Sequence, residues 1–217
     1  MTAKVWSGVS VAIQSALATA VTVGASGVTK ANPGVCTYTG TDPANGDYVL
    51  FSSVVGMYQL DNRVVRVANV NAGANTFELE GVDTTLYDTM TSANVQVITF
   101  GTSLSVATGV QASGGEFEFI DTTTIHNNTR TRIPGVASPI SLSFTCQWDP
   151  ADTALAAFKT ASDSKVTRAV RVTFSDSTKF LFDGYVGFAF VPTGNAQELV
   201  TCSVQIEGAG RPTAYST

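Results

Sequence analysis

Charged side chains are scarce in this chain. They make up 13% of its 217 residues, against about a quarter in an ordinary soluble domain. The polar surface must therefore be built mainly from neutral Ser, Thr, Asn and Gly, and such a surface is poor at keeping copies of a chain apart. The formal net charge is −5 and the basic residues are scattered, which argues against a surface dedicated to holding phosphate. We therefore expect self-association.

Cysteine and histidine are also rare. Cys36, Cys146 and Cys202 have no metal-ligand spacing and cannot all pair. The apolar neighbours of Cys146 and Cys202 predict small buried thiols in a reducing compartment, with a disulfide between these two as the alternative. The single histidine, His126, has no Gly-x-Ser-x-Gly elbow to act with. We therefore predict no catalytic, cofactor-binding or metal-binding residue, and no enzyme.

Long hydrophobic runs are absent. Polar residues interrupt the first 20 positions too often for the apolar core of a signal peptide, about 7–15 residues long. The alternation of apolar and polar residues there predicts a strand over Val5–Gln14 instead. No stretch approaches the roughly 20 apolar residues that span a bilayer. We therefore expect a soluble protein made in the cytoplasm, with no membrane partner.

Alternation with a period of two is the strongest pattern that is present. In residues 168–212, three runs carry apolar side chains at every second position, as in Val200, Cys202, Val204 and Ile206. Because neighbouring side chains on a strand point to opposite faces, each run predicts a strand with one buried face. The short turns between the runs predict an antiparallel meander. Further strands are expected at Val97–Val110 (bent at Gly101), Glu116–Ile120 and Ile140–Trp148.

One short helix is expected between these strands. Asp149 is a good N-cap residue, and Pro150 is favoured at the first helical position. Ala154, Leu155 and Phe158 share one face, which suffices to dock a short helix onto a sheet. The fold class is therefore all-β, a β-sandwich or barrel with a flanking α-helix.

Residues 23–94 have a different character. Short apolar runs are separated by Pro33-Gly34, Asn45-Gly46 and Asn71–Gly73, and such closely spaced strands predict a small β-barrel. We interpret this stretch as a domain inserted into a larger one, which then consists of residues 1–22 and 95–217.

A long polar segment follows the strand at Glu116–Ile120. Loops of more than about 12–15 residues are usually functional or disordered, so this segment is the best candidate for an arm that contacts another subunit. Glu116, Glu118 and Asp121 form a candidate acidic surface, either the lining of a lumen in an assembly or a polar patch that faces solvent. The candidate arm residues are Thr122, Thr123, Thr124, Ile125, His126, Asn127, Asn128, Thr129, Arg130, Thr131, Arg132, Ile133 and Pro134.

The order of these segments resembles the major tail tube proteins of bacteriophages with long non-contractile tails (siphoviruses, lambda-like). The resemblance covers about residues 114–212. It is carried by Ser141–Pro150, Thr153–Lys159, Arg168–Phe174, Phe182–Gly187, Gln197–Val204 and Gly210–Pro212. Separately, Ala31–Gly34, Gly46–Val49, Gly56-Met57, Leu60–Arg63 and Asn75–Leu79 resemble a small β-barrel module of phage structural proteins, which ordinary tail tube proteins lack.

The resemblance implies a structural virion protein in the phage tail, assembled in the cytoplasm of the host bacterium without cofactors. Its copies would form hexameric rings, stacked into a tube through which double-stranded DNA passes during ejection without specific binding. The implied partners are other copies, the tape measure protein, the tail terminator and the distal tail protein. Related tube folds serve contractile tails and injection devices, so one alternative is a tube subunit of such a machine.

A second alternative is a tail-associated binding or decoration module. In this interpretation the stretch 23–94 recognises a host-surface glycan, and four tyrosines provide the stacking surface. These are Tyr38, Tyr48, Tyr58 and Tyr87.

Overall fold

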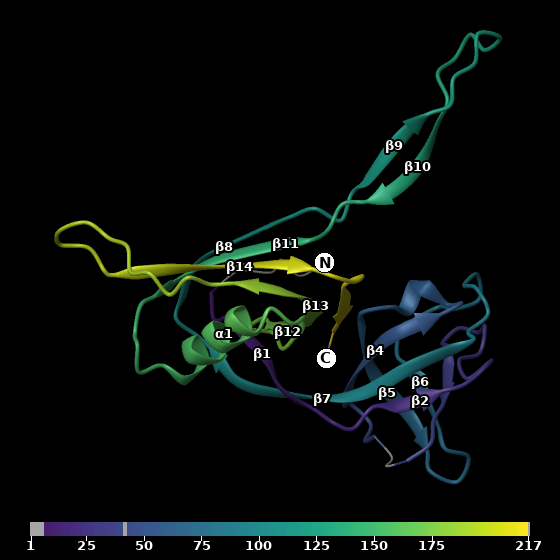
Figure 1. Cartoon of the computed structure of the whole chain (residues 1–217), viewed down its shortest axis with the longest axis horizontal. Coiled ribbons are helices and arrows are strands. Elements are labelled where there is room, and N and C mark those ends of the chain that lie inside the picture. The colour runs from purple at the N-terminus through teal and green to yellow at the C-terminus, as the bar shows by residue number, and fades with distance from the viewer. Residues whose placement is uncertain (1–6, 41–42, 217) are drawn as a thin grey trace.

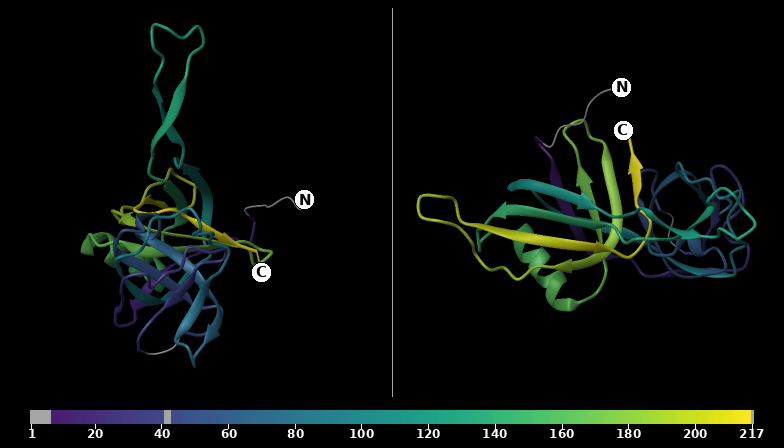
Figure 2. Two further views of the ribbon diagram at one scale, coloured as in Figure 1. Left: turned by 90° about the vertical axis from the view of Figure 1, so that its right-hand side faces the viewer. Right: turned by 90° about the horizontal axis from the view of Figure 1, so that it is seen from above.

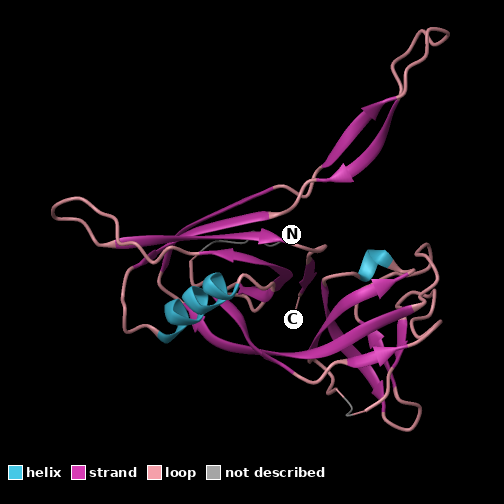
Figure 3. Cartoon of the chain, viewed as in Figure 1, coloured by secondary structure: helices cyan, strands magenta, loops and turns pink. Residues whose placement is uncertain are grey.

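The computed structural model describes residues 7–40 and 43–216, and this part of the chain is all-β with one short α-helix (Figure 1, Figure 3). Within the described residues, 13 strands join one sheet and two more form a separate hairpin. All neighbouring strands are antiparallel, as the short connections predict. The predicted fold class is therefore confirmed.

The larger part of the molecule folds the sheet into two layers. Strand β13 belongs to both, because its first half pairs with β12 and its last residues pair with β14. The first layer contains β8 (Ala107–Ser113), β11 (Ser141–Gln147), β14 (Thr201–Gly208) and the end of β13 (Lys179–Gly187). The second contains the start of β13, β12 (Arg168–Thr173), β1 (Ser10–Leu17) and the end of β7 (Ser92–Leu104).

The main core lies between these layers. Phe144, Phe182 and Val204 are fully buried in it, on the parity that the period-two pattern predicts. Each such side chain contributes about 1.5–3 kcal/mol by leaving water. The core is closed on one side by helix α1 (Thr153–Ser164), whose Leu155 and Phe158 are fully buried.

Helix α1 begins later than predicted. Its N-cap is Asp152, whose side chain accepts hydrogen bonds from the N–H groups of Ala154 and Leu155 at 2.7 and 3.1 Å. Asp149 instead closes a turn by accepting from the N–H of Ala151 at 2.9 Å. Both aspartates suit an N-cap. Asp152 takes this position because it lies directly before the residues that pack on the core.

Two predicted strands have different bounds. The run Val97–Val110 is not one bent strand: β7 ends at Leu104, and β8 begins at Ala107 on the opposite layer. The strand predicted at Val5–Gln14 is observed as β1, Ser10–Leu17. Residues 5 and 6 of the predicted strand lie outside the described part of the chain. The irregular pairing expected near Gly101 is present, since the β1–β7 register shifts around Phe100.

A second core fills the stretch predicted as an insertion. Phe51, Phe77 and Leu79 are fully buried there, and the long strand β7 begins in this core and ends in the main one. The separate-domain interpretation remains a prediction. The elements are β2 (Val21–Val23), β3 (Val35–Thr37), β4 (Tyr48–Val55), the 3₁₀ turn η1 (Tyr58–Leu60), β5 (Arg63–Asn71) and β6 (Thr76–Leu79).

A third cluster joins the two cores, and we call it the junction cluster. Its centre is β15 (Thr213–Tyr215), which pairs with β13 and also contacts β5. The Thr213 hydroxyl donates to the Val64 carbonyl at 2.6 Å, and the Tyr215 hydroxyl accepts from the Arg66 N–H at 2.9 Å. The buried members are Tyr48, Leu50, Val64, Ile98, Ala169, Leu181 and Tyr215.

Candidate assembly surfaces

A two-stranded hairpin projects far from the body of the molecule, as Figure 2 shows. It consists of β9 (Phe117–Asp121) and β10 (Arg132–Ala137), which, among the strands of the described residues, pair only with each other. We call residues 116–138 the arm. Every residue of the arm is exposed except Gly135, which is half-buried. Its apolar side chains are 51–97% exposed, and they are Phe117, Phe119, Ile120, Ile125, Ile133 and Val136.

Two glycines connect the arm to the body. Gly114 and Gly115 have φ values of +86° and +81°, a region that residues with a side chain rarely adopt. A Cβ at Gly114 would lie 2.0 Å from the Pro139 carbonyl oxygen, so no larger residue fits. The Gly115 N–H donates to the Ser138 carbonyl at 3.1 Å. The two strands therefore leave the body side by side from a tight crossing.

The structure corrects the interpretation of residues 122–134 as a loop. Only residues 122–131 form the tip, whereas Arg132, Ile133 and Pro134 lie on β10 opposite Asp121, Ile120 and Phe119. Pro134-Gly135 looks like a break in the sequence, but proline is tolerated on a two-stranded ribbon where its missing N–H faces outward. His126 lies on the exposed tip.

The three acidic candidates belong to the arm rather than to the body. Glu116 precedes β9, and Glu118 and Asp121 lie on it, all exposed. Hydrogen bonds from the Thr123 hydroxyl and N–H hold the pKa of Asp121 below its usual value. Whether these carboxylates face a lumen remains a prediction.

The solvent face of the first layer has an unusual composition. On β8, β11 and β14 the side chains that point away from the core are almost all neutral and polar, and these strands contain no lysine or arginine. The single acid, Glu207, accepts hydrogen bonds from Ser141 at 2.9 Å and Gln205 at 2.7 Å. We call this surface the polar face. It includes Gln111, Ser113, Ser143, Thr145, Ser203 and Gln205.

Sequence analysis missed the polar face, although the signal was present. The polar face is formed by the residues between the apolar positions of the same strands. The absence of lysine and arginine at these positions is visible in the sequence.

Both borders of this layer lack a partner. In the described part of the chain, β8 pairs only with β11. On the other border, β12 pairs with β13 only as far as Gly184, and the remaining residues of β13 pair with β14 alone. Unpaired N–H and C=O groups on a sheet border favour pairing with another chain.

A comparison with protein-family models identifies the family of the chain. The family model described as phage tail tube protein (TTP) matches residues 55–217, which is well over half of the chain. The chain belongs to the phage tail tube protein family. Membership assigns it a structural role in the tail of a phage virion. No curated protein matches the chain.

The tail tube family match is longer than the resemblance seen in the sequence. It begins at residue 55 rather than about 114, so it includes the second half of the stretch predicted as an insertion. It also includes the arm, the polar face and β15.

The cysteines of this tail tube protein are free and buried. Cys146 and Cys202 lie directly opposite each other on β11 and β14, with their Sγ atoms 3.3 Å apart. Burial first, and then the Cys202 thiol, raises the pKa of Cys146 to about 12. Burial alone raises the pKa of Cys36 to about 12. Both thiols are therefore neutral side chains at physiological pH, and the free, buried cysteines agree with the prediction of reduced thiols rather than with the disulfide alternative.

The tyrosines proposed for glycan stacking do not form one surface. Tyr38 and Tyr48 are buried in the second core and the junction cluster. Tyr58 and Tyr87 line a cleft between the second core and the arm. Among the described residues, no group of three or more His, Cys, Asp and Glu side chains could hold a metal ion. None of the described helices has the length and hydrophobicity needed to cross a membrane.

Proposed function

We infer that the chain is the major tail tube subunit of a long-tailed phage. Six copies form a ring, and rings stack around a lumen that DNA crosses during ejection. The polar face lines this lumen. Tape measure, terminator and distal tail proteins are the expected partners inside and at the ends of the tube.

The observation that carries this proposal is the absence of lysine and arginine from the polar face. A conduit must not hold the polyanion that crosses it, because each phosphate contact adds an affinity that depends on salt. Hydroxyl and amide side chains stay hydrated and give DNA no fixed charge to bind. A face that exposes so much Ser, Thr and Gln suits a water-filled channel.

The free borders of the same layer support ring closure. Strands β8, β11, β14 and β13 alternate in direction, so the two outer strands are antiparallel to each other. The end of β13 in one copy can therefore pair with β8 of the next, with the polar face kept on the inside. Closure of such a ring removes both unpaired borders of this layer.

Electron microscopy of the purified protein, alone and with the tail-tip proteins of its phage, tests the assembly. We expect rings and tubes with a central channel. Monomers under all conditions, together with absence from purified tails, would contradict the proposal.

The lumen assignment has its own test. Gln205→Lys adds one positive charge per subunit to the polar face, and tubes of this variant should retain short double-stranded DNA at low salt and release it as salt rises. The control is Lys179→Gln, which removes a positive charge at the start of β13, outside the polar face. DNA retention equal to that of wild-type tubes would place the polar face outside the lumen.

The arm is proposed to contact an adjacent subunit or ring. Replacing residues 122–131 by Asn-Gly leaves Asp121 opposite Arg132 across a two-residue turn. We expect a folded protein that no longer forms tubes. Tubes of normal length from this variant would refute the role of the arm tip.

A further inference from the structure

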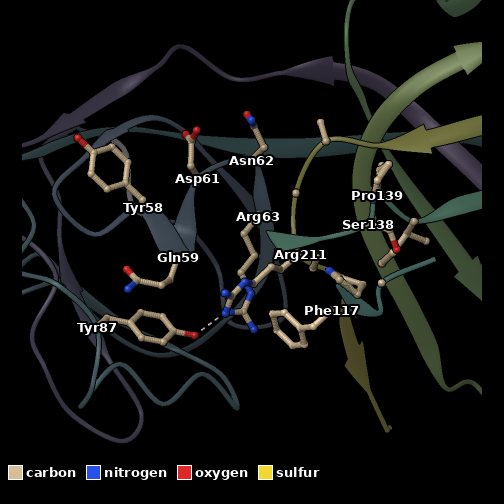
Figure 4. A pocket seen from close by; sticks show the side chains of 17 residues that line it. Tyr58, Gln59, Asp61, Asn62, Arg63, Tyr87, Phe117, Ser138, Pro139 and Arg211 are labelled. Carbon is tan, nitrogen blue, oxygen red and sulfur yellow. Dashed lines mark hydrogen bonds between the residues drawn. The ribbon is translucent and has the colours of Figure 1, made fainter. Parts of the chain in front are cut away.

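A cleft of about 640 Å³ lies where three parts of the molecule meet. One wall comes from the second core, one from the base of the arm, and one from the chain between β14 and β15. We call it the junction cleft, and Figure 4 shows its side chains. Its lining includes Arg63, Phe117 and Arg211.

The junction cleft presents positive charge without a matching acid. Figure 4 shows Arg63 and Arg211 extending into the same part of it, beside the ring of Phe117. Arg63 donates to the Tyr87 hydroxyl at 3.0 Å, but its Nε is buried with no acceptor. In the described part of the chain, no carboxylate lies within ion-pair distance of either arginine. Asp61 also lines the cleft, but Figure 4 shows its carboxylate pointing away from the two guanidinium groups, and it accepts from the Val54 N–H at 3.1 Å.

The junction cleft is therefore suited to an occupant that has a carboxylate next to an apolar side chain. A guanidinium that is partly desolvated gains most from a carboxylate acceptor, and the exposed Phe117 offers an apolar contact.

The loop between β13 and β14, residues 188–200, has this combination. Glu198 is its only charged residue, and the adjacent Leu199 is 67% exposed. The Asn195 side-chain amide donates to the Glu198 carboxylate at 2.8 Å, and the Thr193–Thr201 bridge closes the base of the loop. The carboxylate and the leucine are thus held at the surface of a projecting loop, far from the arm in Figure 1.

This loop and the junction cleft lie at opposite ends of one strand. Strand β14 has 8 residues, so its ends are about 26 Å apart. Its start, Thr201, follows the loop, and its end, Gly208, lines the cleft. One copy cannot place its own loop in its own cleft. A second copy displaced along the strand direction can do so, and the repeated contact produces an open stack.

We propose that residues 195–199 of one copy occupy the junction cleft of the next copy along the tube, with Glu198 between Arg63 and Arg211 and Leu199 against Phe117. This contact rests on the proposed function, because it presupposes stacked copies. The arm tip is not the occupant, since residues 122–131 contain no carboxylate and carry Arg130, which the arginines of the cleft would repel. The second core thereby gains a role, because it provides the wall of the cleft that contains Arg63.

Charge reversal tests this contact. Glu198→Lys and Arg211→Glu should each lower the yield of tubes at least about tenfold, because each sets like charges together in the contact. The double variant should return the yield to within about threefold of wild type. Asp163→Lys, an exposed acid on helix α1, is the matched control and should assemble normally. Circular dichroism confirms that each variant is folded.

The outcomes separate this contact from the proposed function. If wild-type protein forms tubes and the single variants do too, or if the double variant fails while folded, the contact is wrong and the tail tube role stands. If wild-type protein forms no stacked assembly, the proposed function fails and this contact fails with it.

A cross-link gives an independent readout. The three native cysteines are buried, so Phe117→Cys together with Leu199→Cys introduces the only accessible thiols in the described chain. Oxidation of assembled tubes should give a ladder of covalent oligomers that extends beyond six copies, since an open stack has no last member. Absence of cross-links, or a ladder that stops at six, would overturn the contact.

Discussion

The junction cluster has no exposed member, whereas the arm has no buried one. Both contain large apolar side chains on neighbouring strands. In the junction cluster, one copy of the chain covers them, so the second core, β13 and β15 are held as one body. In the arm, six large apolar side chains are more than half exposed, on a hairpin that pairs with no other strand in the described part of the chain. The contrast separates what one subunit completes from what only assembly completes.

The contrast predicts that equal truncations have unequal costs. Leu181 is fully buried in the junction cluster, and Leu181→Ala should lower the free energy of unfolding by about 3 kcal/mol, since it leaves a cavity between two parts that cannot close independently. Ile125→Ala, at the exposed arm tip, is the matched control and should change stability by less than about 0.5 kcal/mol. Urea denaturation of both variants measures the difference. Similar losses would mean that the arm is packed in the isolated subunit.

Burial at the junction also has an electrostatic consequence. Asp183 is fully buried on the same side of β13 as Leu181, and no hydrogen bond of ordinary geometry reaches its carboxylate. Burial raises its pKa from 3.8 to about 6, and weaker interactions with Thr167 and Gly184 oppose the shift only in part. The folded state therefore binds the proton more tightly than the unfolded state, so the contribution of Asp183 to stability falls as pH rises from about 4 to about 6.

Asp183→Asn removes this penalty. At pH 7 the variant should be more stable than wild type by about 2 kcal/mol, and the advantage should shrink towards pH 4. Acids with a lowered pKa, such as Asp121, act in the opposite direction in both proteins, so the difference between variant and wild type is the quantity to follow. A difference that does not change between pH 4 and pH 7 would contradict the assignment.

The two faces of β13 also explain what the sequence could predict. Phe182 shares its parity with Phe180 and Val186, which predicts a core position, and it lies in the core. Leu181 and Asp183 have the opposite parity, which a sheet with one covered face would expose. Both are buried, and Leu181 packs there with Tyr48, Leu50 and Val64 from residues 23–94. Such coverage joins segments far apart in the sequence, and a period of two contains no information about it.

The assembly surfaces divide in the same way. The arm was found from its length, but β10 was not, because its exposed residues show no apolar face and Pro134-Gly135 resembles a break. The polar face follows from the strands already predicted. The free borders and the junction cleft depend on which strands meet, and no local pattern determines that.

The hydrogen bonds of β15 should contribute less than the packing of the junction. Tyr215→Phe keeps the ring under Arg66, at 4.7 Å from the guanidinium carbon, but leaves the Arg66 N–H without its acceptor. We expect a loss of about 1 kcal/mol, measured by urea denaturation. A loss as large as that of Leu181→Ala would show that the hydroxyl, rather than the ring, holds β15 in place.

The arm should show the smallest effect on the subunit and a large effect on assembly. Phe119→Ser and Ile133→Ser replace exposed side chains on the two arm strands, so each should change the free energy of unfolding by less than about 0.5 kcal/mol. In a tube, the same side chains are expected to be covered by a neighbour. Each substitution would then remove about 1.5–3 kcal/mol of burial free energy from every contact between subunits. The critical concentration for tube formation, measured by sedimentation, should therefore rise while the melting temperature stays constant. If the melting temperature falls instead, the arm is held within one copy and cannot be the part that assembly completes.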